Sequence, residues 1–475
     1  MSRGMRWVVI AALMFLMLTS TRVGPMAIIL RYLRWVPLFF LGLAALLIAV
    51  RNRALPRPLN KADAVMLGFV ALALLSSLHS IDPEITLLRG LSVLLMYGAV
   101  FWGVWVYADE FGADEVVRII VATAAIVFGL HIAFGLLDPG GSMPYHGRFR
   151  GWAHNPGTPG GQVALLLPLA LWLALKRSRW QHWLLVGAML LILILSQTRS
   201  EFAAAGVGSF YLLWRALPRR RWLVLASVLI VLVIGFAWVE VGPRLFPSGD
   251  HVISALNSKV ASERGTVESE VASERGTVES EVASERGTVE SMGVGRSEVA
   301  SERGTVESMG VGRSEVAGVA SEQSWLTKPN IRTEDAINLS RRTEKWIKGV
   351  QYLVEKPLLG FGFGTEDQLF AFHGIDIQDY MHTGAYIHQS YLGLALQLGL
   401  LGAALFFIPL GLLVVREIGR ISSSRHDVLR SALLAVVIAA LTSAFMTSWL
   451  YSMGNEAALP FWICVMLLVR TPRTA

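Results

Sequence analysis

Cysteine and charge are the scarcest features of this 475-residue sequence. Cys464 is the one cysteine, so an intrachain disulfide is excluded. It lies in an apolar run, which argues against a thiolate metal site. Only 16% of the residues are charged, whereas a soluble domain has about 25%. The net charge of +7 is spread over short loops. No compact basic domain with interleaved aromatic residues indicates binding of DNA or RNA.

Two common site signatures are also missing. GFGFG at 360–364 is not a dinucleotide fingerprint, because no predicted strand precedes it and the G-x-G-x-x-G spacing is absent. Five histidines near the predicted outer surface could in principle hold a metal: His146, His154, His373, His382 and His388. No pair has HExxH-like spacing and no clear carboxylate partner stands near, so we predict neither a metal nor another cofactor.

Apolar residues dominate instead. They form 54% of the chain, the mean hydropathy is +0.53, and 44 glycines and 15 tryptophans suit a polytopic membrane protein. A membrane helix needs about 20 mostly apolar residues. The candidate spans lie near 5–20, 26–50, 62–78, 86–107, 116–137, 160–175, 182–197, 201–214, 222–241, 387–415, 430–449 and 456–470. We predict an all-α polytopic membrane protein with about twelve transmembrane helices and one large periplasmic loop containing short amphipathic helices.

The distribution of basic residues predicts the orientation. Lysine and arginine gather in the loops 51–61, 176–179, 215–221 and 416–430, with about 20 on that side when the tails and Arg118 are included. The positive-inside rule then places both termini in the cytoplasm. The basic start and apolar core of the N-terminus could form a signal peptide, but no small-x-small site follows, so we predict an uncleaved first span.

Three regions follow from this topology. Residues 1–241 form a membrane domain with the first nine spans, 242–386 a large periplasmic loop, and 387–475 a membrane domain with the last three spans. Within the loop, residues 260–316 contain near-identical copies of VASERGTVES. Each copy offers few apolar side chains to stack, so we predict a disordered or weakly helical insertion, with an adhesive stalk as the alternative.

Sequence complexity returns after the repeat. Residues 338–356 predict an amphipathic helix in which Trp346, Val350 and Leu353/Val354 share one face. The helix should end before Pro357, and GFGFG should form a tight turn with an exposed backbone.

Ionisable residues within apolar segments are rare in membranes and often functional. Arg199, in LILILSQTRSEFAAAG, lies between two apolar helices with almost no loop. It could extend toward the headgroups as a membrane anchor, or bind an anion through its planar guanidinium. Arg341 and Arg342 open the predicted amphipathic helix, where they could also be a solvated basic turn. Arg148 and Arg150 lie in an outer loop with glycine and proline throughout, which should fold back over the mouth of the bundle.

Several outward arginines above an apolar bundle favour a ligand with phosphate groups and an apolar tail, such as a lipid-linked diphosphate. The guanidinium groups would stabilise negative charge on the leaving diphosphate. His388, at the start of an apolar helix, is either an interfacial anchor or a general base toward an acceptor hydroxyl, since the pKa of histidine lies near neutrality.

Four segments together resemble the superfamily of O-antigen ligases, O-antigen polymerases and protein O-oligosaccharyltransferases. HQSYLGLALQLGLLG (388–402) is similar to its H-[N/S/Q]-x9-G-x-x-G signature. The other matching segments, in the same order as in the family, are GWAHNPGTPGG (151–161), LSQTRSEFAAAG (195–206) and RTEKW…KPLLGFGFG (342–364). The sequence departs from the family at Gly157, where the N-P-N segment has its second asparagine, and in carrying the repeat.

The resemblance implies a metal-independent glycosyltransferase of the bacterial inner membrane. It would move a glycan from an undecaprenyl-diphosphate carrier to a periplasmic acceptor, either a lipid A core or a second glycan chain. By the resemblance, Arg199 and Arg342 would bind the diphosphate and His388 would act at the acceptor or donor, so we predict these three as catalytic residues. We further predict substrate binding at these positions: Arg341, Arg150, Arg148, Gln389, Gly399 and Gly402.

Ligase and polymerase use the same donor, so the choice between them stays open, as does a protein hydroxyl as acceptor. Two other classes remain. A solute or anion transporter usually shows internal repeats and charges near the bilayer midplane, and neither is visible here. A scaffolding membrane protein would use the repeat segment to bind a partner.

Overall fold

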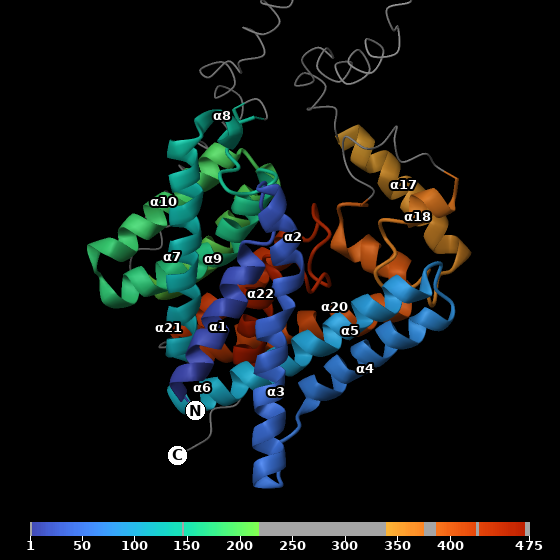
Figure 1. Cartoon of the computed structure of the whole chain (residues 1–475), viewed down its shortest axis with the longest axis horizontal. Helices are drawn as coiled ribbons and strands as arrows, with labels where there is room; N and C mark the ends of the chain where they lie inside the picture. Colours follow the sequence, from blue (N-terminus) through green and yellow to red (C-terminus); the bar gives the residue numbers. More distant parts are fainter. Residues whose placement is uncertain (1, 145–146, 218–338, 375–385, 424–426, 471–475) are drawn as a thin grey trace, which may run out of the picture. The chain divides into compact units, whose positions relative to one another are not determined.

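The computed structural model describes residues 2–144, 147–217, 339–374, 386–423 and 427–470. These residues form helices and no β-strand, and one isolated antiparallel bridge joins Thr21 to Ala153 (Figure 1). The α-helices before the first long gap are α1 (Ser2–Met17), α2 (Gly24–Leu33), α3 (Trp35–Asn52), α4 (Lys61–Leu75), α5 (Pro83–Tyr97), α6 (Trp105–Phe111), α7 (Ala113–Leu137), α8 (Pro139–Ser142), α9 (Gly157–Arg177), α10 (Trp180–Ser196) and α11 (Arg199–Ala216). Those after it are α17 (Leu339–Glu355), α18 (Leu369–Phe372), α20 (Ser390–Ser423), α21 (Val428–Ser443) and α22 (Ala458–Val469). A short 3-10 helix (Ser76–Leu78) follows α4, and a π-helix (Gly98–Val104) joins α5 to α6.

Within the described residues, six helical segments are long and apolar enough to cross a membrane. They are Gly24–Asn52, Lys61–Leu78, Pro83–Phe111, Ala113–Leu137, Gly157–Arg177 and Ser390–Arg420, and four shorter apolar helices accompany them. The described part of the chain is therefore all-helical, and its six candidate spans are those expected of a multi-pass membrane protein. The number of twelve crossings stays a prediction, and its segment 222–241 lies outside the described residues, as does the repeat at 260–316.

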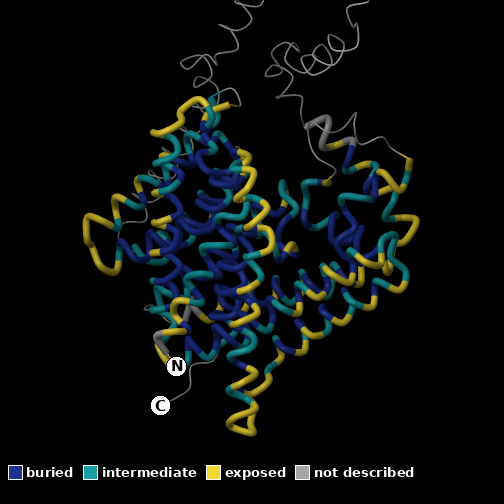
Figure 2. The backbone as a smooth tube through the Cα atoms, in the orientation of Figure 1, coloured by how far each residue is buried: buried dark blue, intermediate teal, exposed yellow. Residues whose placement is uncertain are grey.

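Helices from both ends of the chain share one core. α9 and α11 pack against α21, and α4 packs against both α5 and α20 (Figure 1). Helices α9 and α22 are buried along almost their whole length (Figure 2). A helix that is apolar on all sides is expected in such a central position. The described helices before and after the gap at 218–338 belong to one compact unit, whereas the predicted division at 241 and 387 stays untested.

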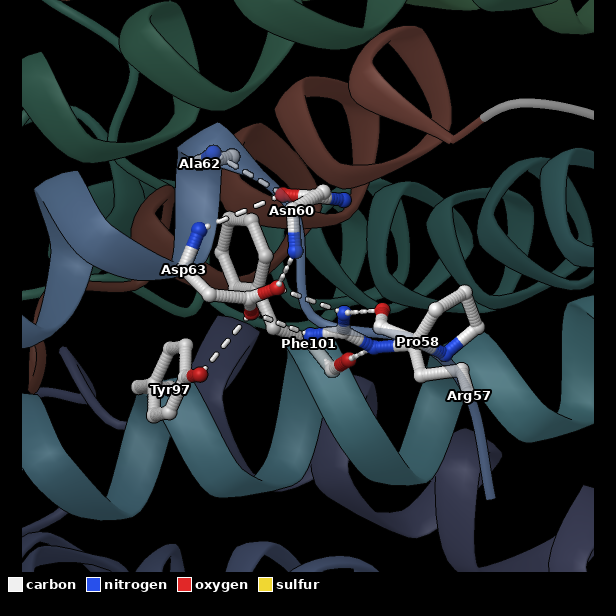
Figure 3. A network of polar contacts seen from close by, with 7 residues as sticks. All are labelled: Arg57, Pro58, Asn60, Ala62, Asp63, Tyr97 and Phe101. Atoms are coloured by element: carbon white, nitrogen blue, oxygen red, sulfur yellow. Dashed lines mark hydrogen bonds and ion pairs between the residues drawn. The ribbon is translucent and has the colours of Figure 1, made fainter. Parts of the chain in front are cut away.

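A buried ion pair fixes the loop between α3 and α4 (Figure 3). Arg57 is 2% exposed, and its guanidinium forms a two-pronged contact with the carboxylate of Asp63. Its Nε also donates to the Phe101 carbonyl of the π-helix at 2.6 Å, while the Tyr97 hydroxyl donates to Asp63 at 2.8 Å. Asn60 and Asp63 form a reciprocal capping box at the start of α4. Arg57 was counted among the basic residues of the loop 51–61, but in the structure its side chain is buried in the core.

The buried face of α17 differs in part from the prediction. Trp346 and Leu353 pack into a small apolar cluster, as expected. Val350 and Val354 are 51% and 74% exposed. The helix instead turns Gly349 inward, where a Cβ would approach the Ile387 side chain at 2.9 Å. Glycine permits this close approach, and the helix rotates accordingly away from the face that apolar spacing favours.

Candidate functional site

His388 lies on the turn that enters α20. Its φ of +57° falls in the left-handed region, which non-glycine residues adopt in only a few per cent of cases. The following residue, Gln389, caps the helix through its side-chain Oε1, which accepts the backbone N–H of Leu392 at 3.0 Å. Such a contact satisfies one of the N–H groups that the first helical turn leaves without a partner. Gln389 thus has a capping contact, and its predicted role toward a substrate stays a prediction.

A buried carboxyl group lies behind this turn. Glu366, two residues after GFGFG, is 3% exposed. Four donors surround it: the Ile387 N–H at 2.9 Å, the Ser448 hydroxyl at 2.9 Å, the Tyr451 hydroxyl at 2.7 Å and the Gln397 side-chain amide at 3.1 Å. Burial raises the pKa of the Glu366 carboxyl above its ordinary value. The group therefore joins three segments: the turn at His388, the first half of α20 and the loop after α21.

The glycine-rich turn pairs with a break in α20. Gly399 is non-helical, with φ 66° and ψ −176°, so the helix is kinked there. Three backbone hydrogen bonds cross between the segments: Phe361 N–H to Leu396 carbonyl at 2.9 Å, Gly362 N–H to Gln397 carbonyl at 2.9 Å, and Leu400 N–H to Pro357 carbonyl at 2.8 Å. The kink makes the Leu396 and Gln397 carbonyls available, because in an unbroken helix they would accept hydrogen bonds from the next turn of α20. The P-x-x-G-x-G and H-Q-x9-G-x-x-G segments are thus one structural unit.

The turn is held on its other side by the loop between α4 and α5. The Ile81 N–H donates to the Phe361 carbonyl at 3.0 Å, and the Phe363 N–H donates to the Ser76 hydroxyl at 3.0 Å. GFGFG at 360–364 was expected to have an exposed backbone, but Phe361 and Phe363 are 1% and 2% exposed. The prediction of a tight turn is confirmed, and the prediction of exposure is wrong because two elements cover it.

Arg199 is the first residue of α11, and its side chain is exposed. The turn before it contains two residues, as the prediction of a hairpin with almost no loop requires. Glu201, in the same helical turn, is 3% exposed and accepts from the Ser443 hydroxyl at 3.0 Å. The positive end of the helix dipole and the guanidinium together favour an anion at this end of α11.

A partly buried set of polar contacts links the start of α11 to the start of α20. The Ser443 hydroxyl, which donates to Glu201, lies 3.0 Å from the Thr447 hydroxyl, and the Ser390 hydroxyl donates to the Thr447 carbonyl at 2.6 Å. Ser390 follows His388 by two residues. Arg199 and His388 therefore each lie at the start of a helix whose first turn contacts the segment 443–447.

The loop at 147–156 folds back onto the α10–α11 hairpin. The Phe149 N–H donates to the Leu195 carbonyl at 2.8 Å, and Arg148 Nε donates to the Ser196 carbonyl at 3.2 Å. Arg150 donates to the carbonyls of Gly141 and His154, each at 2.9 Å. Arg148 therefore ties the loop to the end of α10, next to the turn before Arg199, whereas Arg150 ties the loop backbone to α8. The predicted role of both arginines toward a substrate stays a prediction.

Arg341 and Arg342 lie in the first turn of α17, and their side chains are outside the described part of the structure. The Trp346 Nε1, one helical turn after Arg342, donates to the Ile387 carbonyl at 3.0 Å. Residues four apart on a helix have Cβ atoms roughly 5–6 Å apart. Trp346 therefore ties α17 to the residue before His388, one helical turn beyond Arg342, and the convergence of all three predicted catalytic side chains stays a prediction.

Sequence reasoning missed several residues of this region. Glu366 follows GFGFG as one acidic residue of a loop, and nothing local marks it as buried. Arg89 could have been identified from the sequence, because it is an ionisable residue inside the predicted span 86–107, and such residues are costly in a membrane. It forms a bidentate ion pair with Asp367 at 3.0 and 3.1 Å, beside Glu366.

Two of the histidines weighed as metal ligands, His146 and His382, lie outside the described residues. His373 is engaged elsewhere: its Nδ1 is 2.8 Å from the Leu369 carbonyl, and its ring stacks on Tyr352 with centroids 3.7 Å apart. Within the described ranges, no group of three or more His, Cys, Asp or Glu residues could hold a metal ion.

Comparison with known families gives one match. A family model described as O-antigen ligase matches residues 184–407, which include most of α10, all of α11 and α17, GFGFG and the first half of α20. No curated protein matches the sequence. The matched region contains Arg199, Glu366, His388 and Gly399, so it covers the hairpin, the glycine-rich turn and the kinked helix described above.

Proposed function

Because residues 184–407 place this chain in the O-antigen ligase superfamily, we propose that it transfers a glycan from an undecaprenyl-diphosphate carrier to an acceptor hydroxyl on the periplasmic face of the bacterial inner membrane. The observation that carries the proposal is that Arg199 and His388 each lie at the start of a helix and that contacts from Glu201 through Ser443 and Thr447 to Ser390 join the two helix starts.

The donor diphosphate is assigned to the arginines. Arg199 presents an exposed guanidinium at the positive end of α11, a combination suited to phosphate oxygens. Arg342 would join it from the first turn of α17, with Arg341, Arg148 and Arg150 around them. These cations would stabilise the charge that develops on the leaving diphosphate, so the mechanism assigns no step to a metal.

The acceptor is assigned to His388. Its imidazole removes the proton of the acceptor hydroxyl as the oxygen attacks the anomeric carbon of the donor sugar. A bond forms between that oxygen and the anomeric carbon, and the bond between the anomeric carbon and the phosphate oxygen breaks. The carrier diphosphate leaves with the electron pair, and the proton stays on His388 until solvent removes it.

A polymerase of the same superfamily is the second candidate, because the family match is shared by enzymes that use one donor and different acceptors. A ligase would use a lipid A core, and a polymerase a second lipid-linked glycan. Lipid analysis of a deletion strain separates them. Unmodified core with accumulated long carrier-linked chains indicates a ligase, whereas core capped with a single repeat unit indicates a polymerase.

Three alanine variants test the catalytic assignment: Arg199→Ala, Arg342→Ala and His388→Ala. Each should abolish surface polysaccharide while membrane insertion, measured by immunoblot of membranes, is unchanged. Arg177→Ala is the matched control, because Arg177 is an exposed arginine at the opposite, C-terminal end of α9. Normal polysaccharide in all three variants would refute the proposal. Uptake of an anion by reconstituted protein without glycan transfer would favour a transporter.

A further inference from the structure

The backbone at His388 needs support from its surroundings. A non-glycine residue in the left-handed region is strained, and such strain persists only where neighbouring contacts over-determine the conformation. The backbone N–H groups of the residues before and after His388 are in fact both held. The Ile387 N–H donates to Glu366 Oε1 at 2.9 Å, and the Gln389 N–H donates to the Ser448 hydroxyl at 3.0 Å.

Both of these contacts lead to one oxygen atom. The Ser448 hydroxyl that accepts from Gln389 donates in turn to Glu366 Oε1 at 2.9 Å. Glu366 Oε1 thus accepts the Ile387 N–H directly and is linked to the Gln389 N–H through a single serine. The carbonyl of Ile387 is held separately by Trp346 Nε1 at 3.0 Å.

The other carboxyl oxygen fixes Glu366 itself. Oε2 accepts from the Tyr451 hydroxyl at 2.7 Å and from the Gln397 side chain at 3.1 Å. Gln397 is itself held, because its Oε1 accepts the Gly364 N–H at 2.7 Å. The two oxygens therefore have separate tasks: Oε1 faces the His388 turn, and Oε2 faces the kinked helix and the loop after α21.

We infer that Glu366 is a positioning residue that clamps the backbone N–H groups of Ile387 and Gln389, on either side of His388, and so sets the direction of the imidazole in glycan transfer. The inference rests on the proposed role of His388 as general base. Glu366 does not itself need to contact the substrate, and no proton transfer from it is required. The separation of tasks between its oxygens makes the inference testable apart from a general loss of structure.

Four variants in reconstituted, full-length protein make the test, with purified carrier-linked glycan as the donor. Glu366→Ala removes the clamp and Ser448→Ala removes one of its arms, so both should lower kcat, by about 100-fold for Glu366→Ala, with the donor KM unchanged. Glu366→Gln keeps one acceptor oxygen for the Ile387 N–H and Ser448, so it should restore most of kcat. Tyr451→Phe removes only an Oε2 contact and should keep kcat while lowering the Tm.

Two kinetic results would overturn the inference. One is wild-type kcat in both Ser448→Ala and Glu366→Ala, which would leave the proposed function intact. The other is an equal fall of kcat in Tyr451→Phe and Ser448→Ala, because Glu366 would then act only through general stability. Ser448→Ala keeps the test valid if Glu366→Ala does not fold.

Amide hydrogen exchange separates this inference from the proposed function. Exchange at Ile387 and Gln389 should be faster in Glu366→Ala and Ser448→Ala than in the wild type, and unchanged in Tyr451→Phe. If wild-type protein transfers no glycan, the proposed function fails, and this pattern still supports the clamp. Unchanged exchange in both clamp variants would overturn it whatever the activity.

Discussion

Gly399 packs directly against the backbone carbonyl of Leu358, which occupies the space that a Cβ at position 399 would need. Gly360 has the reciprocal position, since a Cβ there would meet the carbonyl of Gln397 at 2.6 Å. Both glycines have positive φ, 66° in each case. The two glycine-containing segments therefore interlock through their backbones, and the spacing of nine residues between Gln389 and Gly399 sets the length of helix between the His388 turn and this contact.

Replacing Gly399 by alanine should destabilise the folded protein by roughly 1–3 kcal/mol, because its φ and ψ lie in a region used almost only by glycine. The Cβ would also push α20 away from the glycine-rich turn. Gly411→Ala is the matched control, since Gly411 lies in the same helix with no atom near an added Cβ; it should be neutral or stabilising by up to about 1 kcal/mol. Thermal unfolding in detergent, followed by tryptophan fluorescence, measures both. Equal stability of the two variants would contradict the interlock.

Local sequence patterns predicted the helices and the position of Arg199 well. Apolar runs long enough to span a bilayer identify helices directly, and LSQTRSE contains too few residues for anything but a tight hairpin turn. The pairing of GFGFG with the kink was not predictable in this way. It joins residues about 40 positions apart. It also depends on a break in α20, and the only local sign of that break is a glycine inside an otherwise helical run.

The role of Glu366 was unpredictable for a related reason. Its burial comes from Ser448 and Tyr451, some 80 residues further along the chain, while its immediate neighbours resemble an ordinary polar loop. The face of α17 was mispredicted because apolar periodicity counts side chains and ignores glycine. Gly349 decides the packing there by allowing contact with the Ile387 turn.

The Arg57–Asp63 pair should be a strong determinant of stability. Removing one partner of a buried ion pair leaves an uncompensated charge and typically costs about 3–5 kcal/mol. Arg57→Ala also removes contacts to the faces of Trp102 and Trp105, at 4.3 and 4.1 Å from the ring centroids. Arg53→Ala is the control, because Arg53 is exposed at the end of α3 and should change the free energy of unfolding by less than about 0.5 kcal/mol.

Activity gives this prediction a second readout. Tyr97, which contacts Asp63, ends α5, whereas the other end of that fifteen-residue helix begins beside Asp82 and the glycine-rich turn. At 1.5 Å per residue the separation is about 20 Å. Folded Arg57→Ala protein should therefore keep the donor KM of the wild type at a permissive temperature. A specific change in KM with unaltered Tm would show that the pair serves the site instead of the fold.

Deleting residues 260–316 should leave glycan transfer intact. The repeat lies outside the described residues. Its units carry two or three valines each among serine, glutamate and arginine, so the sequence predicts a segment with little apolar surface to pack against the membrane domain. The matched segments that resemble the family lie outside the deletion. Surface polysaccharide measured in a complemented deletion strain should equal that of the full-length chain. Loss of a binding partner in pull-down, with activity retained, would instead give the repeat a scaffolding role, and loss of activity would contradict the prediction.

Glu366 should make the stability of the wild type depend on pH with a defined sign. Burial raises the pKa of its carboxyl in the folded protein above the ordinary value of 4.5, so between the two values the folded state binds more protons than the unfolded state. The slope of the unfolding free energy with pH is proportional to the number of protons bound in the unfolded state minus the number bound in the folded state. Because this difference is negative in the window, stability falls as the pH rises through it. Glu366→Gln has no such titration and should show a flatter profile. Denaturant unfolding of both proteins measures the difference, starting from about pH 4, which is just below the ordinary glutamate pKa. A wild type that gains stability relative to the variant as the pH rises would contradict the burial argument.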